Sequence, residues 1–90
     1  MLTIHKHTLS VTRPVFRLPA GAEILSFGSQ HDDIVMWVKL DDSLPLTEQR
    51  MFEVYGTGWE MADKNYQFIQ TVQTPGGLVF HVFEVLNVHS

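Results

Sequence analysis

The chain has 90 residues, which is the length of a single small domain. Its composition, with 44% hydrophobic and 18% charged residues, is that of a folded globular protein and excludes a disordered chain. Six Lys and Arg residues against ten Asp and Glu residues give a formal charge of −4, and the basic residues are scattered singly. A chain without a basic stripe cannot neutralise a phosphate backbone, so we expect no nucleic-acid partner.

Cysteine is absent from the sequence, which excludes disulfides, thiolate metal sites and a cysteine nucleophile. No apolar run approaches the ~20 residues that a membrane-spanning helix needs, so we expect no membrane partner. The first residues, MLTIHKHTLSV, lack the apolar segment of a signal peptide. Together these features predict a cytoplasmic protein.

Short runs of β-branched and aromatic residues, separated by Gly, Pro, Asp and Ser, predict strands along the whole chain. In chain order the predicted strands cover residues 2–11, 15–18, 22–27, 34–40, 48–55, 66–72 and 78–86. Residues 28–33 and 41–46 are predicted loops, and a helical turn is expected only over 59–65. The regular spacing of the turn signals predicts one all-β domain over residues 1–90, a small antiparallel sandwich or barrel of about six or seven strands.

The clearest strand is the segment 34–40. Val35, Trp37 and Lys39 share one face of it, and four apolar residues share the other: Ile34, Met36, Val38 and Leu40. Because hydrophobic residues occur on both faces, we expect a central strand or a strand beneath a second layer.

A tight turn is predicted between the last two strands, over Thr74-Pro75-Gly76-Gly77. Proline presets φ at the second turn position, and we expect Gly76 to adopt a positive φ at the third. The last two strands are therefore predicted to form an antiparallel hairpin.

Five segments of the chain follow one another in a recognisable order. They are TIHK at 3–6, LPAGAEILS at 18–26, YGTG at 55–58, TVQ at 71–73 and GGLVFHVFE at 76–84. In this order they resemble a family of short uncharacterised proteins encoded by bacteriophages and prophages. The resemblance spans almost the whole chain and implies a phage origin and a stand-alone domain, so the cytoplasm expected above is that of the host. It implies no activity and no set of catalytic residues.

A histidine pair is the only metal-site candidate in the sequence. His5 and His7 lie two residues apart on a predicted strand, so both rings point to one face. With His81 on another strand they make three candidate ligands for zinc. Alternatively, His81 packs among Phe80, Val82 and Phe83. Since no thiolate or recognisable carboxylate completes the site, we expect no stoichiometric metal and no cofactor.

No catalytic residues are predicted. None of the serines lies in a Gly-x-Ser-x-Gly elbow, and the pairs 32–33 and 41–42 are expected to be solvated loop carboxylates. Glu53 and Glu84 lie among apolar strand residues, so they are the candidates for shifted pKa values. Cross-strand basic partners would explain such shifts without catalysis, namely Arg50 or Lys39. We therefore expect a protein that is not an enzyme.

The segment Tyr55-Gly56-Thr57-Gly58-Trp59 is the candidate binding site. One interpretation is that its turn offers backbone N–H groups to a phosphate, but the segment lacks the Walker lysine. The favoured interpretation is a strand-ending turn that needs glycine torsions. An aromatic residue on such a turn can anchor a partner. The alternative is that Trp59 folds over one end of the barrel as a plug, and the sequence leaves both alternatives open.

The favoured function is a phage-encoded, non-enzymatic interaction protein that binds and blocks a host protein, such as a component of antiviral defence. The first alternative is a small-ligand protein that sequesters a nucleotide signal, and the second is a minor virion or assembly component. A small all-β chain also leaves strand edges unpaired, so we expect a homo-oligomer that covers at least one edge.

Overall fold

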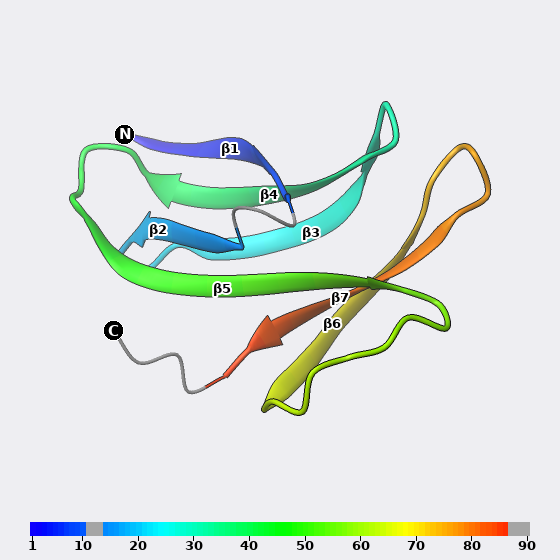
Figure 1. The fold of residues 1–90 in the computed structure, drawn as a ribbon. Helices are drawn as coiled ribbons and strands as arrows, with labels where there is room; N and C mark the ends of the chain where they lie inside the picture. Colours follow the sequence, from blue (N-terminus) through cyan, green and yellow to red (C-terminus); the bar gives the residue numbers. More distant parts are fainter. Residues whose placement is uncertain (11–13, 87–90) are drawn as a thin grey trace.

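The computed structural model describes residues 1–10 and 14–86 of the chain, and it shows an all-β fold. Seven antiparallel strands form two sheets, which confirms the predicted fold class. The strands are β1 (Leu2–Thr8), β2 (Val15–Pro19), β3 (Glu23–Gln30), β4 (Asp33–Asp41), β5 (Leu46–Gly56), β6 (Tyr66–Gln73) and β7 (Val79–Val85). One sheet has the order β1-β4-β3 and the other has the order β2-β5-β7-β6 (Figure 1).

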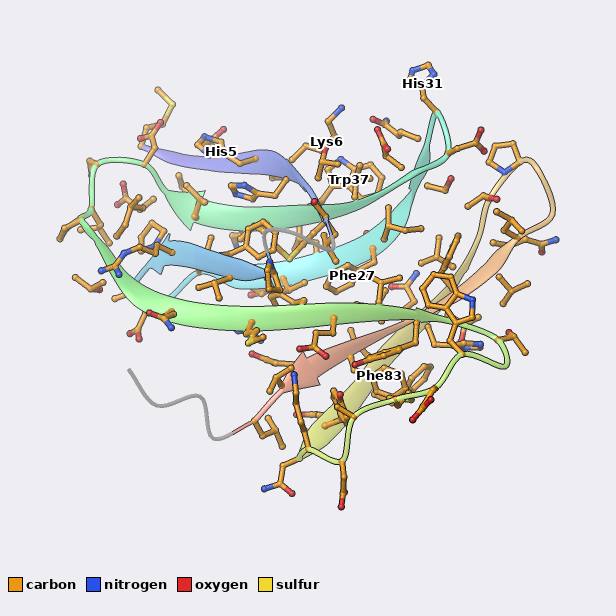
Figure 2. All side chains as sticks on the ribbon, viewed as in Figure 1. His5, Lys6, Phe27, His31, Trp37 and Phe83 are labelled. Carbon is orange, nitrogen blue, oxygen red and sulfur yellow. The ribbon has the colours of Figure 1, made fainter. Side chains whose placement is uncertain are left out.

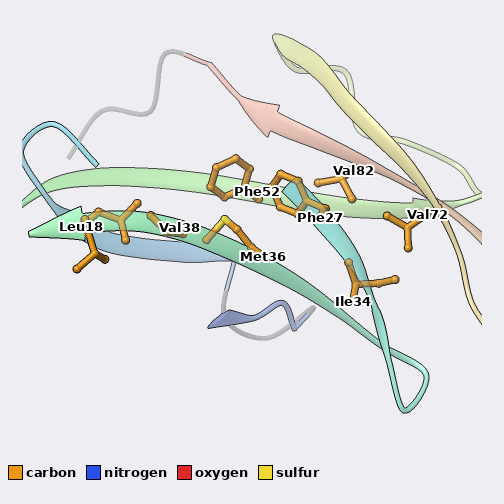
Figure 3. Close-up of a cluster of buried hydrophobic side chains, with 9 residues drawn as sticks. Leu18, Phe27, Ile34, Met36, Val38, Phe52, Val72 and Val82 are labelled. Carbon is orange, nitrogen blue, oxygen red and sulfur yellow. The ribbon is translucent and has the colours of Figure 1, made fainter. Parts of the chain in front are cut away.

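The hydrophobic core lies between the two sheets (Figure 3). The four side chains predicted to share one face of β4 are all buried there, and β4 is the central strand of its sheet, as expected. β5 and β7 supply the facing side of the core through Phe52 and Val82. The buried core residues are Leu18, Phe27, Ile34, Met36, Val38, Leu40, Phe52, Val72 and Val82.

The turn between β3 and β4 is tighter than predicted. The expected loop over 28–33 is wrong, because β3 continues to Gln30 and β4 begins at Asp33. His31 and Asp32 both have positive φ, 50° and 67°, and two such residues form the kind of turn that matches the twist of a hairpin. Histidine and aspartate tolerate a positive φ better than most residues, although His-Asp indicates a hairpin turn in a sequence less strongly than Asn-Gly does.

The turn between β6 and β7 is a hairpin turn, as predicted, but its glycines have other roles. The positive φ, 86°, is at Gly77 and not at Gly76. The N–H of Gly77 donates to the carbonyl of Thr74 at 3.0 Å, and the N–H of Thr74 donates to the carbonyl of Leu78 at 2.9 Å. This pattern is a tight turn followed by one left-handed residue, which is common in three-residue hairpin loops.

The segment 59–65, the one place where a helical turn was allowed, is an irregular loop, and no helix occurs in residues 1–10 and 14–86. Near its two ends Trp59 packs on Phe80 and Lys64 binds Glu53. The loop predicted over 41–46 is shorter, because the carboxylate of Asp41 accepts hydrogen bonds from the N–H and hydroxyl of Ser43 and closes the turn early.

The two sheets are joined at one edge by the side chain of Gln70. Its Oε1 accepts a hydrogen bond from the N–H of Phe27 at 3.0 Å, and its Nε2 donates to the carbonyl of Phe27 at 2.7 Å. The amide therefore takes the place that a neighbouring strand would occupy beside β3. In the described part of the chain, no helix is long and apolar enough to cross a membrane.

We expect Gln70→Leu to lower the free energy of unfolding by about 2 kcal/mol, because it leaves two backbone groups of Phe27 without partners. Gln73→Leu, on the same strand and exposed, is the matched control and is expected to change stability by less than about 0.5 kcal/mol. Chemical denaturation of the three proteins measures the difference. Equal losses in both variants would contradict the role assigned to Gln70.

Candidate functional site

A cleft of about 500 Å³ opens between the sheets, where the β3–β4 hairpin faces the end of β5. Its apolar wall comes from both sheets and from the loop after β5, and its volume lies in the range of ligand-binding pockets. The lining residues among those described are Leu9, Ser10, Pro14, Asp32, Asp33, Ile34, Phe52, Glu53, Val54, Tyr55, Trp59 and Phe80.

Trp59 lies at the rim of this cleft. Its backbone N–H donates to the carbonyl of Gly56 at 3.1 Å, and its ring packs edge-on against Phe80 with the centroids 5.9 Å apart. The side chain is nevertheless 56% exposed. Trp59 is therefore neither a buried plug nor a fully free anchor, because one side of the ring is packed and the other is open to solvent.

Gly56 provides the surface on which the indole of Trp59 rests. A Cβ atom at Gly56 would lie 2.6 Å from Cε2 of Trp59, closer than real contacts allow. The positive φ in this segment is at Gly58, 86°. The glycines were predicted to serve backbone torsion, but this explanation holds for Gly58 alone, and Gly56 is needed for close approach.

Tyr55 borders the cleft, but its ring lies elsewhere. The ring packs edge-on against Tyr66 and Phe83, and its hydroxyl donates to Glu53 at 2.6 Å. Along β7, Phe83 alternates with the core residue Val82, so the Tyr55–Phe83 cluster is on the outer face of the sheet, away from Phe27 (Figure 2). The structure therefore separates the two aromatic rings of the predicted binding segment.

Thr57 takes part in a hydrogen-bonded chain that the sequence did not reveal. Its hydroxyl lies 2.9 Å from Nε2 of His81, and Nδ1 of His81 lies 3.0 Å from the hydroxyl of Thr71. The arrangement of Thr57, His81 and Thr71 resembles the nucleophile, base and orienting group of a catalytic triad, but the third group is a neutral hydroxyl instead of a carboxylate. The chain ties the glycine turn to β6 and β7. Its prediction would have needed both the register Thr71↔His81 and the register Tyr55↔His81.

Glu53 and Glu84 both have basic partners, as the sequence analysis predicted. Arg50 forms a two-pronged ion pair with Glu84, at 2.7 and 2.8 Å, which is one of the two predicted partners. Lys64, rather than Lys39, binds Glu53 at 2.6 Å. Burial opposes the ionisation of Glu53, but hydrogen bonds from Lys64 and Tyr55 outweigh it and lower its pKa. The carboxylate of Glu53 therefore stays ionised near neutral pH.

The carboxylates of Asp32 and Asp33 differ from those of Glu53 and Glu84. Both residues are exposed and line the cleft. Within the described ranges, neither carboxylate has an ion-pair partner. The described polar rim of the cleft thus carries two uncompensated negative charges.

The three histidines considered for a metal do not meet. His5 and His7 lie on β1 with their ring centroids 6.3 Å apart, whereas His81 lies on β7 of the other sheet. Figure 2 shows His5 on one sheet and Phe83, which lies on β7 two residues after His81, on the other. Among the described residues, no group of three metal-ligating side chains is assembled. His7 instead packs edge-on against Phe16, with its Nε2 buried and unpaired.

The position of Trp59 predicts a small effect on stability. We expect Trp59→Ala to cost about 1 kcal/mol, since roughly half of the ring is already exposed. Phe52→Ala is the matched comparison, because Phe52 is 2% exposed and its loss is expected to cost ~3–5 kcal/mol. Thermal or chemical unfolding separates the two. A loss at Trp59 as large as that at Phe52 would show that the indole is a core plug.

The burial of His7 predicts a pH-dependent stability. Burial, and then the nearby charge of His5, lowers its pKa below the usual 6.5, so the unfolded chain takes up the proton first as the pH falls. Stability is therefore expected to decline as the pH is lowered through 6.5 towards the folded pKa. His7→Phe is expected to reduce that decline, measured as unfolding free energies at several pH values. His31→Asn, at the exposed turn, is the control that should retain it.

Comparison with known proteins identifies the family of this chain. No curated protein and no solved structure matches it. One family model, described as a domain of unknown function (DUF7352), matches residues 1–90. Since the match covers the whole sequence, the chain belongs to the DUF7352 family.

Proposed function

We propose that this protein is a non-enzymatic, phage-encoded interaction protein that binds and blocks a host protein. In this proposal, the cleft beside Trp59 takes up a partner segment with apolar and basic side chains. The phage origin and the host partner rest on the resemblance of the sequence. The single observation that carries the binding role is the open apolar cleft with two carboxylates at its rim, Asp32 and Asp33, that have no ion-pair partner among the described residues.

The lining of the cleft favours this chemistry of partner. Ile34, Val54 and Phe80 offer apolar surface to aliphatic side chains, and the half-packed ring of Trp59 offers a face to a cation or an apolar group. Asp32 and Asp33 attract a Lys or Arg of the partner. Aromatic anchors of this kind commonly contribute a large share of binding energy at protein interfaces.

A nucleotide signal fits the same cleft less well. Phosphate groups need cationic or N–H donors, and the described lining contains carboxylates but no Lys or Arg. The volume of about 500 Å³ nevertheless suits a small neutral or cationic molecule, so a small-ligand protein remains the second candidate. Catalysis is not part of the proposal, because the Thr57–His81 pair lies on the outer face, away from the cleft.

Trp59 itself provides the test. In the Trp37→Phe variant, Trp59 is the sole tryptophan and reports on the cleft by fluorescence. Short peptides of alternating Arg and Leu, or of alternating Glu and Leu, are titrated against it. We expect the basic peptide to shift the emission and to bind at least about tenfold more tightly than the acidic one.

A matched pair of variants separates the cleft from general charge attraction. Asp32→Asn with Asp33→Asn is expected to weaken binding of the basic peptide severalfold. Glu23→Gln with Glu48→Gln removes the same charge outside the cleft and is expected to leave binding nearly unchanged. Equal binding of both peptides would contradict the proposal. Tight binding of a nucleotide by the same assay would favour the sequestering alternative.

A further inference from the structure

The two sheets have four edge strands, and three of them carry features that discourage pairing with another chain. β1 contains Lys6, and β2 is short and contains both Arg17 and Pro19. β3 begins with Glu23, has a register shift, and is covered at Phe27 by the amide of Gln70. Charges, proline, bulges and covering groups are the usual protections of edge strands.

β6 differs from these three edges. Its sequence, YQFIQTVQ, contains no charged residue and no proline. It lies at the end of the four-stranded sheet, where β7 is the only described strand paired with its backbone, and its contact with β3 is made through the side chain of Gln70 (Figure 1). Its one irregularity is the register shift between Phe68 and Gln70. An eight-residue edge of this composition is a surface suited to pairing with another strand.

Apolar side chains flank this edge on the outer face of the sheet. Phe68 is 56% exposed, and its ring continues the cluster of Phe83, Tyr66 and Tyr55 up to the free edge. Val79, which pairs with Gln73 next to the edge, is 36% exposed. A strand pair alone buries little area, so these side chains would supply the apolar part of a stable interface.

We propose that β6 is the self-association surface of this protein, pairing antiparallel with β6 of a second copy about a twofold axis. Two copies each carry a formal charge of −4, so an uncharged edge is where they approach with the least repulsion. The pairing joins two four-stranded sheets into one continuous sheet of eight strands. It leaves the cleft open and is independent of the proposed function.

Charge placed on β6 tests this surface. Phe68→Lys and Gln73→Lys are each expected to raise the dimer dissociation constant at least about tenfold, because pairing of the edges would then desolvate an ammonium group that has no partner there. Val15→Lys is the matched control, since Val15 is 42% exposed on the opposite edge of the same sheet. Sedimentation equilibrium over a concentration series gives the constants. A native protein that stays monomeric at high micromolar concentration overturns the proposal, and so does a dimer weakened only by Val15→Lys.

The absence of cysteine allows a direct distance measurement. Thr71 lies near the middle of β6, so in the proposed dimer the two copies of this residue are only a few residues apart along the paired strands. Nitroxides attached to Thr71→Cys in the two copies are therefore expected to lie within about 20 Å of each other. On Val15→Cys they are expected to lie about 33 Å or more apart, because seven strand spacings separate the two outer edges. Electron spin distance measurements of the two dimers decide between them. The reverse order of distances would place the interface at β2 and refute the assignment to β6.

Discussion

The contact between Phe27 and Phe52 holds the two sheets together, and the rest of the structure depends on it. These rings meet edge-on with centroids 5.4 Å apart, one from each sheet, and both are almost fully buried. Phe16 continues the contact along Phe52, and Arg50 lies over the same ring. Phe52 therefore unites the two sheets in the core and also forms part of the cleft wall. Loss of this contact would disturb the stability of the fold and the shape of the cleft together.

Ionic interactions divide the surface into compensated and uncompensated regions. On the four-stranded sheet, Glu53 and Glu84 are matched by Lys64 and Arg50, so this part of the molecule is close to neutral. The excess negative charge is exposed elsewhere, including the tip of the β3–β4 hairpin at Asp32 and Asp33. Short-range pairing therefore determines where the overall acidity is available to a partner.

The sequence was sufficient to predict most of the strands, because alternation of apolar side chains depends on local geometry alone. The burial of Met36 and Val38 could be anticipated in this way, whereas the ion pair of Arg50 with Glu84 was one of several pairings that the sequence left open. The cleft could not, since it depends on which strands become neighbours across the two sheets. The hydrogen bonds between Gln70 and Phe27 likewise join residues far apart in the chain, so no local sequence pattern indicates them.

The predicted binding segment was only partly recognised for the same reason. Period-two alternation places Tyr55 and Gly56 on opposite faces of β5, but the return of Trp59 over Gly56 depends on the turn that follows. The sequence therefore indicated the correct region and could not show that its two rings separate. The hydrogen bonds of His81 to Thr57 and Thr71 could be predicted only by knowing how β5, β6 and β7 are aligned with one another.

The contact of Trp59 with Gly56 also has a consequence for how this family evolves. An indole that rests on a bare backbone depends on a missing side chain, so the two positions are not free to vary separately. Relatives with a small residue at the position of Trp59 can accept a larger one at that of Gly56. Relatives that retain the ring are expected to retain the glycine, and covariation of these two positions would record a local geometry that neither residue reveals alone.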